Sequence, residues 1–99
     1  MRVSFGNPDV LRRFLYMKLG VIGIIIEGNR SVATVVNAIL SEYSDLIIGR
    51  MGLPNREDEI YLISVGVKGS AERISAMTGR IGRLDGVKIK SAVSDVDID

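Results

Sequence analysis

Two short segments carry the residues of this chain that are best suited to hold a charged ligand. The first is Gly28-Asn29-Arg30-Ser31, where a flexible turn leads into the expected start of a helix. Backbone N–H groups and the helix dipole at such a start favour an anion such as a carboxylate or a phosphate. The same four residues also fit a purely structural role, as an ordinary turn with Ser31 as the helix N-cap.

The second segment surrounds Arg50 and Gly52, near the end of an expected strand. An arginine flanked by glycines can reach into an interface without crowding, and its fixed charge suits a carboxylate on a ligand or on a partner. A binding role and a structural role both stay open here. The two segments together give the candidate ligand-binding residues, which are Gly28, Asn29, Arg30, Ser31, Arg50 and Gly52.

Two further charged clusters fit a structural role better than a binding role. Residues 57–59 are three carboxylates in a turn, but a calcium site needs an organised loop with more oxygen ligands than this. Arg73, Arg80 and Arg83 share one side of an expected helix, and we interpret them as its solvent face because no aromatic residues lie between them. We therefore expect no metal site and no cofactor.

The chain contains neither cysteine nor histidine. Their absence excludes disulfides, thiolate and imidazole metal ligands, cysteine nucleophiles and Ser–His dyads. Catalysis would have to rest on arginine, tyrosine or carboxylates, and no pair of these residues has a recognisable spacing. We therefore expect a protein that is not an enzyme.

Length and composition indicate a single folded domain. The chain has 99 residues, of which 46% are apolar and 25% are charged, as is typical of globular proteins. The longest apolar run, residues 19–26, is far shorter than the roughly twenty residues of a membrane helix, and no signal-peptide cleavage site follows it. We expect a cytoplasmic protein that does not engage a membrane.

The middle of the chain reads as strand, helix and strand, twice over. In the first unit, strands at 19–27 and 46–53 flank a helix whose apolar residues recur at steps of three and four. These residues are Val32, Val35, Val36, Ile39, Leu40 and Tyr43. In the second unit, strands at 60–67 and 87–93 flank a helix with a shorter apolar stripe. That stripe consists of Ile74, Met77, Ile81 and Leu84.

Two such units joined by right-handed crossovers predict an α+β fold, the ferredoxin-like βαββαβ plait, with a four-stranded antiparallel sheet and two helices on one face. The strands at 19–27 and 60–67 are central in this topology. Both are apolar or small on both sides, although the helices cover only one face, so we expect another copy to cover the second face. The sequence therefore predicts a homodimer or homotetramer that assembles through the sheet.

Some residues lie outside this plan or are unusual within it. We expect residues 1–16 to form an N-terminal extension with a short amphipathic helix, residues 17–94 to form the folded domain, and residues 95–99 to form an acidic tail.

Gly79 and Gly82 lie inside the second helix, where each glycine is about 1 kcal/mol less favourable than alanine. We expect another part of the structure to pack closely against them.

Two longer motifs carry a resemblance to a known family. They are residues 42–54, EYSDLIIGRMGLP, and residues 77–87, MTGRIGRLDGV. These segments resemble the small regulators assigned to iron-only hydrogenase systems, and the likeness covers about residues 17–94. Those proteins are similar in turn to ACT domains and to the ligand-sensing C-terminal domain of nickel-responsive repressors. The resemblance implies an ACT-like plait over residues 17–94 that works as a dimer or tetramer.

The chain departs from these relatives at several functional positions. Where the nickel repressors place histidines, it has Ser44, Gly52 and Pro54, so the resemblance implies no nickel site. Amino-acid-binding ACT domains commonly open the first helix with a glycine after Asp or Asn, whereas here Asn29 is followed by Arg30. There is also no room for the ribbon-helix-helix domain of the repressors, and we therefore expect no direct DNA binding.

We therefore expect a non-enzymatic, oligomeric regulatory module of an iron-only hydrogenase system that senses a small-molecule effector. One alternative is an assembly or scaffold subunit for a metallo-enzyme. Another is an RNA-binding plait, which needs exposed aromatic residues on the two central strands for base stacking. Tyr61 is the only aromatic residue that the sequence offers there.

Overall fold

The computed structural model describes residues 17–28, 30–55 and 57–94. Its elements follow the predicted βαββαβ order, with a short 3-10 helix at Ser44–Leu46 before the second strand. They are β1 (Met17–Glu27), α2 (Arg30–Glu42), β2 (Ile47–Asn55), β3 (Ile60–Ser70), α3 (Ala71–Gly82) and β4 (Val87–Val93). The predicted extension at residues 1–16 and the predicted tail at residues 95–99 lie outside the described residues.

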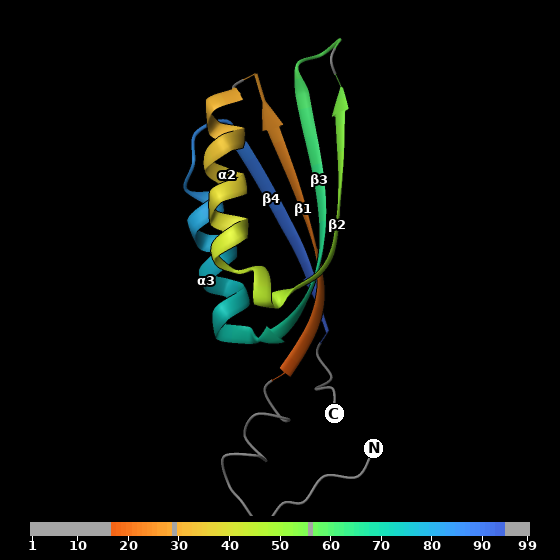
Figure 1. Ribbon diagram of the computed structural model, residues 1–99, viewed down its shortest axis with the longest axis vertical. Helices are drawn as coiled ribbons and strands as arrows, with labels where there is room; N and C mark the ends of the chain where they lie inside the picture. Colours follow the sequence, from red (N-terminus) through yellow and green to blue (C-terminus); the bar gives the residue numbers. More distant parts are fainter. Residues whose placement is uncertain (1–16, 29, 56, 95–99) are drawn as a thin grey trace, which may run out of the picture.

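The four strands form one antiparallel sheet in the order β2-β3-β1-β4, so β1 and β3 are central, as predicted. Ile24 of β1 pairs with Ile63 of β3 on one side and with Ile89 of β4 on the other. Both helices lie on the same face of this sheet (Figure 1). The predicted ferredoxin-like plait is therefore confirmed.

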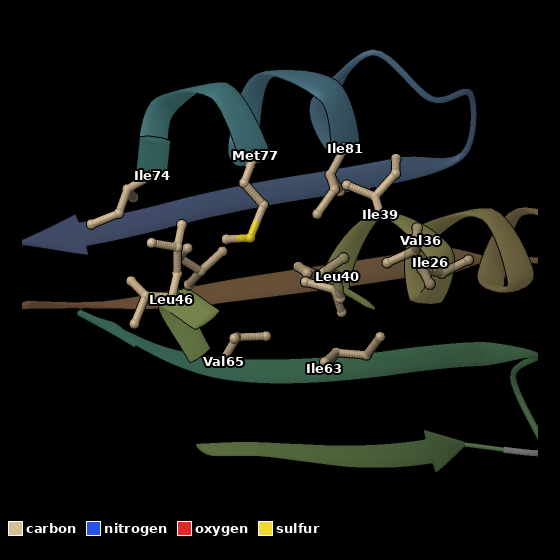
Figure 2. Close-up of a cluster of buried hydrophobic side chains, with 13 residues drawn as sticks. Ile26, Val36, Ile39, Leu40, Leu46, Ile63, Val65, Ile74, Met77 and Ile81 are labelled. Carbon is tan, nitrogen blue, oxygen red and sulfur yellow. The ribbon is translucent and has the colours of Figure 1, made fainter. Parts of the chain in front are cut away.

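The core lies between the helices and the sheet. Thirteen apolar side chains are buried there, and Figure 2 shows how those from α2 and α3 meet those from β1 and β3. The strands contribute every second residue, because successive side chains of a strand point to opposite faces. The core residues are Ile22, Ile24, Ile26, Val36, Ile39, Leu40, Leu46, Ile63, Val65, Val67, Ile74, Met77 and Ile81.

Three details of the sequence prediction are wrong. Ser31 is not the N-cap of the first helix, because α2 already begins at Arg30. Val35 is not part of the buried stripe, since it is 44% exposed and lies about 100° around the helix from the buried Val36. The third strand does not end at residue 67 but continues to Ser70, whose hydroxyl accepts a hydrogen bond from the Arg73 N–H at 3.2 Å and caps α3.

The two helix glycines have different surroundings. A Cβ atom at Gly82 would lie 3.2 Å from the Cγ2 atom of Ile89, so the predicted close packing is confirmed at this position. At Gly79 the described residues place nothing within 4 Å of such an atom, and the prediction is wrong there. Within the described part of the chain, no helix has both the length and the apolar character to cross a membrane.

Candidate functional site

Arg50 connects the outer strand β2 to helix α2. Its Nη2 atom donates a hydrogen bond to Oδ1 of Asn37 at 2.6 Å, and Asn37 Nδ2 in turn donates to the Ala33 carbonyl at 2.9 Å. The guanidinium therefore lies on the helix-covered side of β2 and remains exposed there. An arginine has five N–H donors in a planar fork, so a carboxylate could bind to the donors that Asn37 does not use.

Gly52 is the next residue of β2 on this side, and the side chain of Tyr61 limits the space above it. A Cβ atom at Gly52 would lie 2.8 Å from the Tyr61 hydroxyl oxygen, closer than real Cβ contacts come. Tyr61 is half-buried and packs against the core on the helix-covered face. Tyr61 therefore lies on the face that the helices cover, and not on the open side that an RNA-binding plait uses for base stacking.

The turn before α2 contains the other predicted site residues. Gly28 has a φ of +65°, which favours glycine, and its N–H donates to the Glu59 carbonyl at 2.8 Å. Ser31 lies exposed in the first turn of α2. Asn29 and the side chain of Arg30 lie outside the described residues.

These two groups of residues occupy separate places in one protomer. Gly52 pairs with Ile63, which pairs with Ile24, four residues before Gly28. At about 3.3 Å per residue, this separates the two places by about 13 Å along the strands, with β3 between them. Helix α2 is common to both, because it begins beside Gly28 and meets Arg50 through Asn37. Their joint action in one site stays a prediction.

The arginines of α3 are held by partners from the end of α2 and the residues that follow it. Arg80 pairs with Glu42 and Arg73 pairs with Asp45, and both guanidiniums lie over the ring of Tyr43, at 5.8 and 5.6 Å from its centre. The hydrogen bond from each guanidinium, together with its charge, lowers the pKa of the carboxyl group that it contacts. These arginines therefore tie α3 to the corner after α2, whereas the sequence predicted only a solvent-exposed face for them.

The acidic turn at residues 57–59 is exposed. Across residues 17–28, 30–55 and 57–94, no three acidic side chains come close enough together to hold a metal ion. Glu59 has a φ of +54°, and its carbonyl accepts the Gly28 N–H. The described part of this turn thus connects to the start of α2.

A group of exposed apolar side chains lies on the side of the sheet opposite the helices. No described element covers this side (Figure 1), and large side chains are exposed on it, including Val21 at 57%, Met51 at 56% and Ile48 at 64%. Ile48 packs over Gly66 on this side, 3.3 Å from the position of a Cβ there. We define the open face by six exposed residues, Leu19, Val21, Ile48, Met51, Leu53 and Leu62. Large exposed apolar patches are uncommon on monomeric soluble proteins.

Solved structures with the same arrangement include two single domains and one uncharacterised protein. An uncharacterised protein from Thermotoga maritima, TM1266, is 27% identical with a TM-score of 0.75, over 78% of this chain and 96% of that one. The ACT domain of GTP pyrophosphokinase from Chlorobium tepidum is 16% identical with a TM-score of 0.61, over 75% of this chain and 96% of that one. The C-terminal domain of the MgtC protein from Mycobacterium tuberculosis is 10% identical with a TM-score of 0.62, over 80% of this chain and 89% of that one.

The likeness to the GTP pyrophosphokinase domain shows that the fold is ACT-like. Among curated protein sequences, none matches this chain. The family described as "TM1266-like: Iron-only hydrogenase system regulator, putative" matches residues 18–91, from the start of β1 almost to the end of β4. The chain belongs to this TM1266-like family.

Proposed function

We propose that this protein is a non-enzymatic regulatory module of an iron-only hydrogenase system, which works as a homo-oligomer assembled through the sheet and binds a small effector. The observation that carries the proposal is the open face. Val21, Met51 and Ile48 are each more than half exposed there, whereas the same sheet buries Ile22, Ile24 and Val65 completely on its other side. Association would remove this apolar surface from water.

Strand β2 provides a physical link between an effector and assembly. Its residues alternate, so Arg50 and Gly52 lie on the helix-covered side while Met51 and Leu53 belong to the open face. A ligand that competes with Asn37 for the Arg50 guanidinium would change how α2 holds β2. Because β2 contributes to the assembly surface, such a ligand would shift the equilibrium between assembled and free chains.

The effector class that fits Arg50 is a small molecule with a carboxylate. The guanidinium is exposed, permanently charged and already oriented by Asn37. The start of α2 at Gly28-Asn29-Arg30-Ser31 would offer a second anchor, from the same chain or from its partner. In this proposal, assembly brings the anchors of two chains within reach of one ligand.

A thermal-shift screen of the full chain tests effector binding. The probes are the common amino acids, the adenine and guanine nucleotides, and the chlorides of nickel, iron and zinc. We expect a carboxylate-bearing probe to raise the melting temperature, and we expect Arg50→Gln to remove this rise. Arg83→Gln is the matched control, because Arg83 is an exposed arginine at the far end of α3.

The screen can also contradict the effector proposal. A rise that survives in Arg50→Gln would place the ligand elsewhere. If no probe raised the melting temperature and the protein co-purified with a hydrogenase component, the scaffold role would be supported instead.

A further inference from the structure

We infer that two copies of this chain stack their open faces against each other, related by a two-fold axis that runs along the strands between β1 and β3. The inference rests on the assembly in the proposed function and gives it a geometry. Aligned face-to-face packing places two sheets about 10 Å apart, with the side chains of the facing surfaces interdigitated. The alternative is a continuous eight-stranded sheet formed through an edge strand.

Both edges of the sheet are poorly suited to a continuous sheet. At the β2 edge the register shifts between Ile47 and Gly49, and Pro54 lacks the N–H that a paired strand would need. The β4 edge carries Lys88 and Lys90 within a strand of seven residues, and charged side chains of this kind oppose edge pairing. These features favour the face of the sheet over either edge.

The open face has the dimensions of an interface. The axes of the outer strands are about 14 Å apart, and Leu19 and Ile25 are about 20 Å apart along β1. With the side chains at the margins, the outline is roughly 20 by 25 Å, or about 500 Å² per copy before the corrugation of the side chains is counted. Stable interfaces begin near about 600 Å² per partner. The outline alone is somewhat smaller than this threshold, and the interdigitated side chains of two facing copies would add to the buried area.

The charged side chains of this side lie at its margins. At one end Lys88 forms an ion pair with Glu27, with 3.2 Å between Nζ and Oε1. At the other end Lys68 lies opposite Leu19, and Lys90 is on the outer strand. The centre of the face is thus free of charge, as the core of an interface between identical chains usually is.

The middle row of the open face selects the direction of the axis. In register across the sheet, this row consists of Lys90, Gly23, Ser64 and Met51. An axis along the row would stack Lys90 on the same residue of the second copy, with like charges together. An axis along the strands places Lys90 over the second copy's Met51 and Lys68, at the end of the face, over its Leu19, so each apolar stem packs and each ammonium group reaches solvent.

Single cysteine variants test this geometry in the full chain, which has no cysteine of its own. Ser64 lies beside the proposed axis, so we expect most of Ser64→Cys to become a covalent dimer on oxidation with copper–phenanthroline or with a short bis-maleimide. Ser75→Cys is the control, since Ser75 is exposed on α3, away from the open face, and we expect it to remain uncoupled. We expect Lys90→Cys to remain uncoupled as well, because the axis separates the two β4 strands by the width of the sheet.

Each other outcome overturns part of the account. Efficient coupling of Lys90→Cys would show that the axis runs across the strands. If Ser64→Cys did not couple while light scattering still showed a dimer, face-to-face stacking would be wrong and the proposed assembly would stand. A wild-type chain that is monomeric in light scattering would show that the proposed assembly is itself wrong. The same conclusion would follow if residues 1–16 covered the open face. Circular dichroism of each variant checks that it is folded.

Discussion

The two faces of the sheet are built from the same strands but reach opposite outcomes. On one face, Ile24 and Ile63 are completely buried by the helices. On the other face, Val21, three residues before Ile24, and Leu62, directly before Ile63, are exposed. The comparison shows that the helices cover one face, whereas apolar side chains of the described residues stay exposed on the other.

The largest change in the free energy of unfolding should come from a substitution on the helix-covered face of the sheet. Ile24→Ala removes three buried carbons from the centre of the core, and we expect it to lower the free energy of unfolding by about 2–5 kcal/mol. Val35→Ala is the control, because Val35 is an exposed apolar residue of α2, and we expect a change within about 0.5 kcal/mol. Urea denaturation at one fixed protein concentration measures both. Equal losses in the two variants would contradict the assignment of the core.

Substitutions on the open face should weaken the association of two chains and leave the folding of each chain unchanged. Val21→Lys places an unpaired charge inside the proposed interface, and we expect a dissociation constant at least a hundredfold higher, or about 3 kcal/mol. Val35→Lys makes the same change on the helix side and should leave association unchanged. Sedimentation equilibrium measures both constants. Weakened association in Val35→Lys alone would move the interface to the helices.

A smaller effect is expected where β2 meets Tyr61. Gly52→Ala brings a methyl group onto the Tyr61 hydroxyl, and we expect a loss of about 1 kcal/mol in the free energy of unfolding. The same substitution in a Tyr61→Phe background should lose less, because the next ring atom is 3.4 Å away, at an ordinary contact distance. A double-mutant cycle measures the coupling. Additive losses would show that the Tyr61 hydroxyl is not the reason that position 52 requires a glycine.

The smallest effect concerns acid sensitivity at the outer ion pairs. The pKa values of Glu42 and Asp45 are lowered from 4.5 and 3.8 by hydrogen bonds from Arg80 and Arg73. Because the folded-state pKa values are the lower ones, the stabilisation is complete above these ordinary values and is lost as the pH falls below them. We expect the Glu42→Gln/Asp45→Asn double variant to lose less stability between pH 6 and pH 3 than the wild type, measured by thermal unfolding. An identical pH profile would contradict a stabilising role for the pairs.

Much of the fold follows from the sequence because periodicity and topology agree. Alternation in residues 87–93 and steps of three and four in residues 74–81 predict the edge strand and the second helix that the structure shows. Topology then makes residues 19–27 and 60–67 the central strands, which is also correct. The periodicity of α2 wrongly placed Val35 in the buried stripe, because a valine beside that stripe cannot be told from one within it by its residue type.

The contacts of the candidate site could not be predicted in the same way. The hydrogen bond between Arg50 and Asn37 joins an outer strand to a helix, and nothing in the residue types indicates that pairing. The direction of Tyr61 depends on the register of β3, which only the pairing with β1 and β2 fixes. The pairs of Arg73 and Arg80 were missed as well, although the segment Glu42-Tyr43-Ser44-Asp45 holds two carboxylates and an aromatic ring. Tertiary proximity, not local pattern, decides these contacts.

The central claim is that the open face is covered by a second copy of the chain. Sedimentation velocity of the unmodified protein, across concentrations from the low to the high micromolar range, tests it most directly. We predict a species of at least twice the 10.8 kDa mass of the chain that persists through most of this range. A single species with the mass of one chain at every concentration would contradict the claim.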